Sequence, residues 1–169
     1  QMNHSQLNHG QMNQREIWLV RHGETEWSRT GRHTSFTDVP LTAEGERRAV
    51  AVAALLAGKH FDLVLSSPMR RAMDTCRLAG YGGARITNDL AEWNYGSYEG
   101  RTTAEIQQEQ PDWTIWSATP PGGETAEQVA ARADRAIATA AASGGDVLLF
   151  GHGHMLRVLA ARWLGLTAS

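Results

Sequence analysis

The sequence alternates between short apolar runs and longer segments of helical periodicity, and this alternation restricts the fold more than any other feature. The apolar runs lie at residues 17–20, 62–65 and 146–150 and have the length of buried strands, and the first is rich in β-branched and aromatic residues. A weaker strand signal lies at residues 85–87. The segments between them carry helix signals, at about residues 42–58, 67–80, 125–142 and 154–164. Strands that alternate with helices predict an α/β three-layer sandwich, with a mostly parallel sheet covered by helices on both faces.

Short polar side chains mark where the helices begin. Thr42 and Thr125 are predicted N-caps, because a threonine hydroxyl can accept a hydrogen bond from an N–H group of the first turn. Ser66 or Ser67 is the predicted cap of the second helix, with Pro68 in its first turn. On the long helix, Arg132 is predicted to lie on a solvated face.

The composition argues against several classes of protein. The net charge of -2 and the isoelectric point near 6.4 give no overall basic field, so we expect no nucleic-acid partner and no membrane partner. No run of about 18 apolar residues is present to span a bilayer. The one cysteine, Cys76, rules out an internal disulfide, and the first fourteen residues lack the apolar core of a secretory signal. These features predict a cytoplasmic protein.

Two parts of different character follow one another along the chain. Residues 1–15 form a polar, low-complexity arm rich in Gln and Asn, with too little apolar surface to fold alone. Residues 16–169 are long enough to bury a core of their own. We therefore expect one folded domain after the arm.

Cationic and polar residues follow three of the predicted strands. The first is followed by Arg21-His22-Gly23, the second leads through two serines into Arg70-Arg71, and the last is followed by Gly151-His152-Gly153-His154. A single histidine at a strand end is usually a structural residue. Because the carboxyl ends of parallel strands meet at one edge, however, these side chains are expected to converge there. The pattern predicts a cationic pocket that suits phosphate.

The residue types at this edge fit phosphoryl transfer. Arginine presents a planar, permanently charged fork to phosphate oxygens. A neutral imidazole, as at His22, can attack phosphorus, and neighbouring cations keep it unprotonated. Gly23 and Gly153 are expected to let the backbone approach an anion closely. A bound phosphate disfavours the ionised form of a carboxyl group beside it, which suits a general acid. Glu92 is the first candidate for that acid and Glu99 the second.

Four motifs in order resemble the histidine phosphatase superfamily, also called phosphoglycerate-mutase-like: LVRHGETEWS, SSPMRRAMDT, LAEWNYGSYEG and GHGHMLR. The resemblance covers about residues 16–165 and implies the phosphoglycerate-mutase-like fold, a catalytic domain over 16–169 and no metal or other cofactor. By position, His22 matches the phosphorylated histidine, His152 the second catalytic histidine and Glu92 the proton donor. The resemblance places the following residues at the phosphate or the substrate: Arg21, Arg71, Gly153 and His154. Ser28 is the last residue of the first motif and Thr34 lies downstream of that motif, and both are expected to border the same pocket.

Within the superfamily, the sequence resembles the sugar-bisphosphatase and acid-phosphatase branch. The expected activity is hydrolysis of small phosphomonoesters, such as sugar phosphates, through a phosphohistidine. The alternative is a cofactor-dependent phosphoglycerate mutase, but the mutases carry a longer insertion with Arg and Lys after the acidic motif. Here that interval holds no lysine and one arginine, Arg101. A metal-dependent hydrolase using His152 and His154, or a non-catalytic phosphate-binding module, is a weaker alternative.

Members of this superfamily usually continue past the last helix with one more strand segment. This chain ends at Ser169, shortly after the predicted helix. We therefore expect either a truncated end or a partner surface over that place; the polar arm is a weaker alternative, because its composition argues against a strand. A homo-oligomer is a separate expectation.

Overall fold

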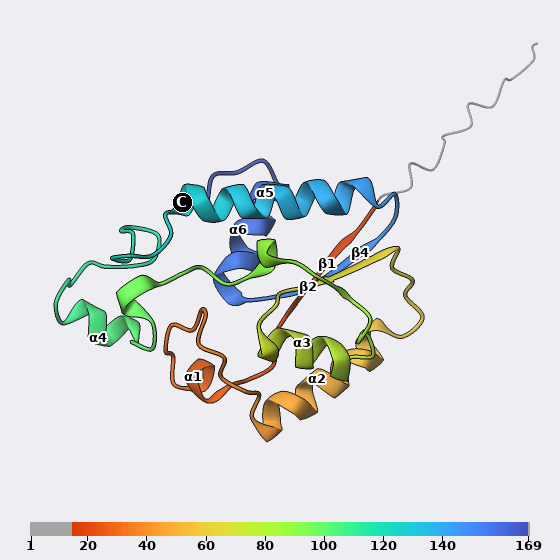
Figure 1. Cartoon of the computed structure of the whole chain (residues 1–169), viewed down its shortest axis with the longest axis horizontal. Helices are drawn as coiled ribbons and strands as arrows, with labels where there is room; N and C mark the ends of the chain where they lie inside the picture. The colour runs from red at the N-terminus through yellow and green to blue at the C-terminus, as the bar shows by residue number, and fades with distance from the viewer. Residues whose placement is uncertain (1–14, 169) are drawn as a thin grey trace, which may run out of the picture.

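The computed structural model describes residues 15–168 (Figure 1). The predicted polar arm therefore lies, apart from Arg15, outside the described residues. The helices and strands are β1 (Ile17–Arg21), α1 (Glu26–Arg29), α2 (Ala43–Leu56), β2 (Leu63–Ser66), α3 (Arg70–Leu78), β3 (Arg85–Ile86), α4 (Thr103–Gln107), α5 (Ala126–Ala142), β4 (Val147–Gly151) and α6 (Gly153–Trp163). Two 3₁₀ turns, Asn88–Leu90 and Gly96–Tyr98, interrupt the loop-rich interval between β3 and α4.

The four strands form one parallel sheet in the order β1-β4-β2-β3. Strand β4 lies at its centre, with Leu149 opposite both Leu19 of β1 and Leu65 of β2. All five residues of β4 are buried, as expected for a strand with neighbours on both edges and helices on both faces. The predicted α/β fold is confirmed.

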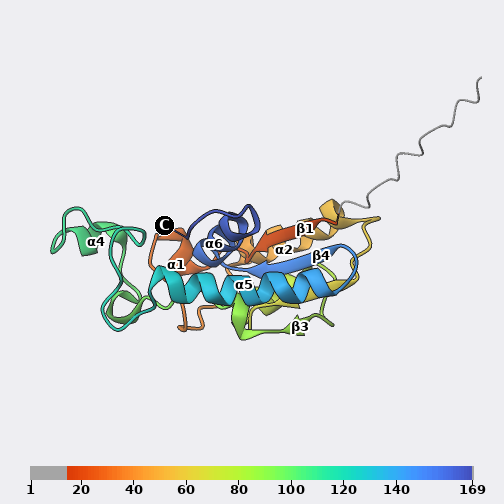
Figure 2. The same ribbon diagram turned by 90° about the horizontal axis from the view of Figure 1, so that it is seen from above.

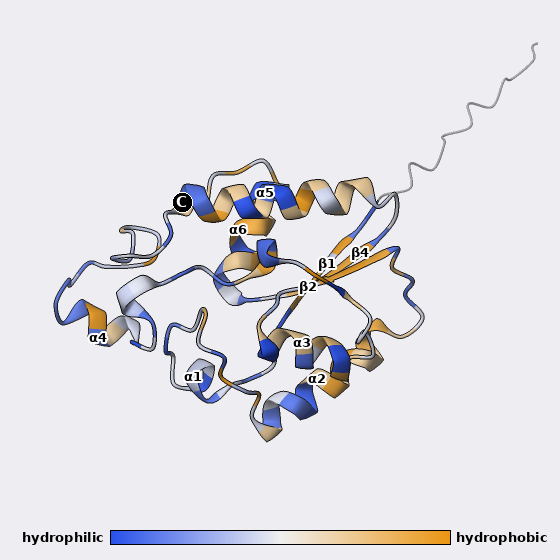
Figure 3. Cartoon of the chain, viewed as in Figure 1, coloured by the Kyte–Doolittle hydropathy of each residue, from blue (hydrophilic) through white to orange (hydrophobic). Residues whose placement is uncertain are grey.

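Side chains of β4 alternate between two apolar clusters, one on each face of the sheet. Val147 and Leu149 belong to the cluster with residues of α5 and α6, whereas Leu148 and Phe150 belong to the one with Leu56 of α2 and with α3. In Figure 1 the pair α5 and α6 lies above the strands and the pair α2 and α3 below them. Figure 3 shows largely hydrophobic strands between helices that carry both hydrophobic and hydrophilic residues. These layers are the predicted sandwich.

The predicted threonine caps are present, but the serine cap is wrong. The hydroxyl groups of Thr42 and Thr125 accept hydrogen bonds from N–H groups in the first turns of α2 and α5. Helix α3 begins later than expected, with Met69 as its N-cap and no side-chain cap. The hydroxyl of Ser67 instead lies against His152, a residue 85 positions away that no local signal could reveal.

The loop-rich interval and α1 lie beyond the carboxyl ends of the strands, at the left of Figures 1 and 2. These segments and the strand ends together bound the predicted pocket. Among the described residues, no helix has both the length and the apolar composition needed to cross a membrane.

Candidate active site

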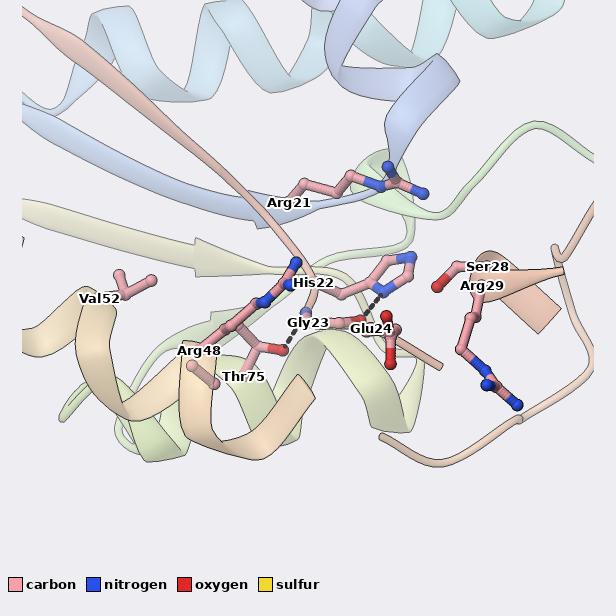
Figure 4. A pocket seen from close by; sticks show the side chains of 10 residues that line it. Arg21, His22, Gly23, Glu24, Ser28, Arg29, Arg48, Val52 and Thr75 are labelled. Carbon is pink, nitrogen blue, oxygen red and sulfur yellow. Dashed lines mark hydrogen bonds between the residues drawn. The ribbon is translucent and has the colours of Figure 1, made fainter. Parts of the chain in front are cut away.

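His22 lies at the end of β1 in a fixed orientation. Its backbone N–H donates to the carbonyl of Gly151 (3.0 Å), which continues the pairing of β1 with β4. The N–H of the next residue, Gly23, donates to the hydroxyl of Thr75 on α3 (2.9 Å; Figure 4). The Nδ1 atom of His22 lies 2.7 Å from the carbonyl oxygen of Gly23. Because a carbonyl only accepts, Nδ1 carries the hydrogen, and in the neutral ring Nε2 keeps a free lone pair.

Burial and neighbouring cations lower the pKa of His22 from 6.5 to about 4. Burial is the largest cause, the hydrogen bond to Gly23 opposes it, and the charges of Arg71 and Arg21 add to the lowering. The imidazole is therefore neutral at pH values where an ordinary histidine is already protonated. This is the state in which Nε2 can act as a nucleophile.

A histidine NMR titration of the free protein tests this state. Because the folded pKa is below the ordinary value, the His22 ring should remain neutral as the pH falls through 6.5 and become protonated only near pH 4. Direct titration avoids the ionisation of a phosphate substrate, which overlaps this range. Circular dichroism over the same pH range reports whether the protein remains folded. Protonation of His22 near 6.5 in the folded protein would contradict the assignment.

His152 follows β4 and lies beside His22. The side chain is fully buried, and the centres of the two imidazole rings are 5.1 Å apart. Its Nε2 atom lies 2.7 Å from the hydroxyl oxygen of Ser67. Burial and the charges of Arg71, His22 and Arg21 hold the pKa of His152 well below its usual value, so this ring is also neutral.

Arg71 brings a buried positive charge to the pair of histidines. Its guanidinium donates to the carbonyl oxygens of Thr37 (3.1 Å), Thr34 (3.1 Å) and Ser35 (2.9 Å), and it forms no ion pair with another described residue. Burial lowers its pKa. Among the described residues, the buried side-chain nitrogen and oxygen atoms without a partner are Nε of Arg71 and Nδ1 of His152. Two unpaired nitrogens in one cluster are suited to the oxygens of an anion.

Arg21 and Glu92 both lie close to Gly153. A Cβ atom built on Gly153 would lie 3.6 Å from Nε of Arg21 and 3.9 Å from Oε2 of Glu92. The side chain of Arg21 has no hydrogen bond or ion pair with another described residue, so its charge is free to meet a ligand. In Figure 4 its guanidinium extends from the end of β1 toward the start of α6, whereas Arg29 runs away from His22.

The Glu92 carboxylate occupies the N-terminal end of α6. Its Oε1 accepts from the N–H groups of Trp93 (2.9 Å) and Met155 (2.8 Å), and its Oε2 accepts from that of His154 (3.1 Å). The side chain lines the cavity together with His22. Glu99, the second predicted acid, instead accepts from the N–H groups of Ser35 and Thr37 and is not among the residues that line this cavity. The geometry favours Glu92.

The cavity in front of His22 has a volume of about 220 Å³. Its lining includes these predicted residues: Arg21, His22, Ser28, Thr34, Glu92, Gly153 and His154. An adjoining cavity of about 320 Å³ shares Arg21, His22 and Ser28. Arg71 and His152 lie buried behind these surfaces rather than on them.

Two predicted lining residues have structural partners. Ser28 and Thr25 form a capping box at α1, in which each side chain accepts from the backbone N–H of the other. The hydroxyl of Thr34 donates to the carbonyl of Arg32 (2.9 Å). Both remain at the cavity wall, but neither hydroxyl is free in this structure.

Gly23 is required for a different reason from the one expected. A Cβ atom there would lie 2.5 Å from the carbonyl oxygen of Gly45, in the first turn of α2. The close approach is therefore to helix α2, and no anion is needed to explain the glycine. A Cβ atom on Gly153 would make only ordinary van der Waals contacts, so packing does not require a glycine there.

Three residues that sequence reasoning missed support the site. The phenol oxygen of Tyr95 lies 2.6 Å from Nδ1 of His154, and burial raises the pKa of Tyr95 well above its usual value, so the phenol donates that bond. The hydroxyl of Thr75 accepts a hydrogen bond from the N–H of Gly23.

Arg132 was expected in solvent, but it is half-buried. Its guanidinium donates to the carbonyl of Glu92 (3.2 Å) and pairs with the carboxylate of Glu124 (2.7 Å). It fixes the loop that carries the candidate acid.

The described residues contain no group of three or more His, Cys, Asp or Glu side chains placed to hold a metal ion. Two of the histidine nitrogens that a metal would use, Nε2 of His152 and Nδ1 of His154, are already hydrogen-bonded to Ser67 and Tyr95. The metal-dependent alternative therefore gains no support from the described part of the chain.

Comparison with known proteins gives consistent results. The family model described as "Histidine phosphatase superfamily (branch 1)" matches residues 17–169. An acid phosphatase of Mycobacterium tuberculosis is 46% identical over 154 residues, which are 89% of this chain and 76% of that protein. A solved structure of an open reading frame product from Mycobacterium tuberculosis is similar with a TM-score of 0.88 and 45% identity, covering 92% of this chain and 82% of the other.

Relatives with other activities are less similar. A sedoheptulose 1,7-bisphosphatase of Saccharomyces cerevisiae is 35% identical over 182 residues, covering 88% of this chain and 67% of that protein. A 2,3-bisphosphoglycerate-dependent phosphoglycerate mutase of Cytophaga hutchinsonii is 33% identical and covers 83% of this chain and 73% of that protein.

Proposed function

The chain belongs to branch 1 of the histidine phosphatase superfamily and is a phosphatase, and from this premise we propose that residues 16–169 form its catalytic domain. We propose further that it hydrolyses small phosphomonoesters through a phosphohistidine at His22. The convergence of a neutral His22, a neutral His152 and the buried Arg71 on one place carries the proposal. Such a site is built to receive and stabilise a phosphoryl group.

Two displacements account for the reaction. In the first, the Nε2 lone pair of His22 attacks phosphorus, a P–N bond forms, and the ester P–O bond breaks as the alkoxide takes the proton of Glu92. In the second, water attacks phosphorus, Glu92 takes its proton, and the P–N bond breaks to restore the lone pair. Arg21, Arg71 and His152 donate to the phosphoryl oxygens in both steps, and fixed donors of this kind lower the barrier because they need not reorganise.

The cavity supports a small substrate with a second anionic group. Its volume of about 220 Å³ is below the range of about 300–1,000 Å³ that is typical for drug-sized ligands. Among the described residues, three arginine side chains have no hydrogen bond or ion pair: those of Arg21, Arg85 and Arg157. Arg21 and Arg157 line this cavity, and Arg85 does not. With Arg21 near the scissile phosphate, Arg157 is left for a second phosphate, as in a sugar bisphosphate.

A mutase activity has less support. Between Glu92 and α5 the sole arginine is Arg101, and its guanidinium binds the carboxylate of Glu109 (2.7 Å) and the carbonyl of Glu105 (3.0 Å). It is absent from the residues that line the cavity. This segment therefore offers no free cation to hold the carboxylate of a phosphoglycerate during isomerisation.

Phosphate release from a matched set of esters tests the proposal. The set is fructose 1,6-bisphosphate, fructose 1-phosphate and fructose 6-phosphate, all assayed with EDTA present. We expect kcat/KM to be highest for the bisphosphate. In Arg157→Gln, the ratio of bisphosphate to monophosphate kcat/KM should fall about tenfold, which corresponds to about 1.4 kcal/mol. In the control Arg85→Gln, the ratio should equal that of the wild type.

The outcomes separate the two parts of the proposal. Absence of phosphate release from every ester would overturn the phosphatase assignment, as would complete loss of activity with EDTA. Active enzyme with the same ratio in wild type and Arg157→Gln would overturn the second-anion site alone. Conversion of 3-phosphoglycerate to its 2-isomer at a higher rate than hydrolysis would favour the mutase.

A further inference from the structure

The hydroxyl group of Ser67 takes no part in the reaction steps, yet it contacts a residue that does. Ser67 directly follows β2, is fully buried, and places Oγ 2.7 Å from Nε2 of His152. Its backbone N–H donates to the carbonyl of Phe150 (2.9 Å), which continues the pairing of β2 with β4. The hydroxyl therefore meets His152 from a rigid position.

The other partner of this hydroxyl determines which way the hydrogen bond runs. The N–H of Met69 donates to Oγ of Ser67 (3.3 Å), and an amide can only donate. The hydroxyl hydrogen of Ser67 is then free to point at Nε2 of His152. If Nε2–H donated instead, the hydroxyl hydrogen would have no acceptor among the described residues. Leaving a buried donor unpaired costs about 1–3 kcal/mol.

The direction of this bond fixes the tautomer of His152. Because the ring is neutral, it carries a single N–H. A lone pair on Nε2 that accepts from Ser67 requires the hydrogen on Nδ1. This Nδ1 is one of the two unpaired buried atoms in the cluster with His22 and Arg71. An N–H there stabilises a phosphoryl oxygen, whereas a lone pair would repel it.

We propose that Ser67 is a positioning residue that donates its hydroxyl hydrogen to Nε2 of His152 and so keeps an N–H on Nδ1 for the phosphoryl group. The kinetic part of this inference rests on the proposed phosphatase function, whereas the tautomer does not. Ser67 acts through His152 and touches no reacting atom.

The tautomer can be measured by NMR on the whole protein with ¹⁵N-labelled histidine at neutral pH. In the wild type, the His152 signals should show a protonated Nδ1 and an unprotonated Nε2. In Ser67→Ala this preference should be lost. The matched control is Ser66→Ala, because Ser66 is equally buried but its hydroxyl donates to the carbonyl of Ser67 (3.0 Å) and does not touch His152. In the control the wild-type tautomer should persist.

Kinetics give the second measurement. We expect Ser67→Ala to lower kcat about 10- to 100-fold, by analogy with the loss of a residue that orients a metal-bound imidazole, and Ser66→Ala to lower it less. A wild-type His152 protonated on Nε2 would overturn the inference even if no variant folded. Equal kcat losses in the two variants would also overturn it. If the wild type hydrolyses no ester but shows the expected tautomer, the proposed function fails and the tautomer assignment stands.

Discussion

Replacing His22 by alanine is expected to lower kcat/KM for every phosphate ester by at least about a thousandfold, or about 4 kcal/mol of barrier. The substitution removes the Nε2 lone pair that is proposed to attack phosphorus, which the hydrogen bond of Nδ1 to Gly23 leaves free. The measurement is the rate of phosphate release, with each ester assayed separately. The size of the effect follows from the loss of the covalent route itself, because water would have to attack the ester directly.

A second histidine provides the control for this substitution. His60 is a surface residue whose side chain is 88% exposed, so His60→Ala makes the same chemical change far from the cavity. We expect its kcat/KM to match the wild type. Activity of His22→Ala within about tenfold of the wild type would remove His22 from its role, since a tenfold change is only about 1.4 kcal/mol.

Replacing Glu92 by glutamine should have an effect that depends on the leaving group. For alkyl phosphates, whose alkoxides need a proton, we expect kcat/KM to fall about 100- to 10,000-fold. For p-nitrophenyl phosphate, whose leaving group is stable as an anion, the fall should be about tenfold or less, and the ratio of the two losses is the informative quantity. Hydrolysis rates for a series of esters of graded leaving-group acidity measure it.

The matched control for this prediction is Glu99→Gln. Glu99 also accepts backbone N–H groups, from Ser35 and Thr37, so the change from carboxylate to amide disturbs it in the same way. Any loss in this variant should be equal for good and poor leaving groups. A leaving-group dependence in Glu99→Gln but not in Glu92→Gln would exchange the roles of the two residues.

The fold was predictable because its signals are local or periodic. The apolar runs correspond to the strands, and Thr42 and Thr125 cap α2 and α5, since a cap needs only a polar side chain beside the first turn. The meeting of Arg21, His22 and His152 was also predictable, because the carboxyl ends of parallel strands share an edge. Four motifs in order supplied the family.

The supporting contacts were not predictable because their partners are far apart in sequence. Ser67 was interpreted as a cap from its place before a helix, but its hydroxyl is used by His152. Arg132 was placed in solvent because it lies on a helix, but the loop around Glu92 folds over it and offers carbonyl groups. Arg71 was expected to bind phosphate, and its donation to the carbonyls of residues 34, 35 and 37 depends on the path of a loop without regular structure.

The most direct test of the account is to find where the phosphoryl group resides during turnover. Wild-type enzyme that is hydrolysing p-nitrophenyl phosphate is quenched in alkali, which preserves phosphohistidine, and its peptides are analysed by mass spectrometry. The account predicts phosphate on the peptide with His22, bound to Nε2, and none in His22→Ala. Phosphate on any other residue of an actively hydrolysing enzyme would contradict it.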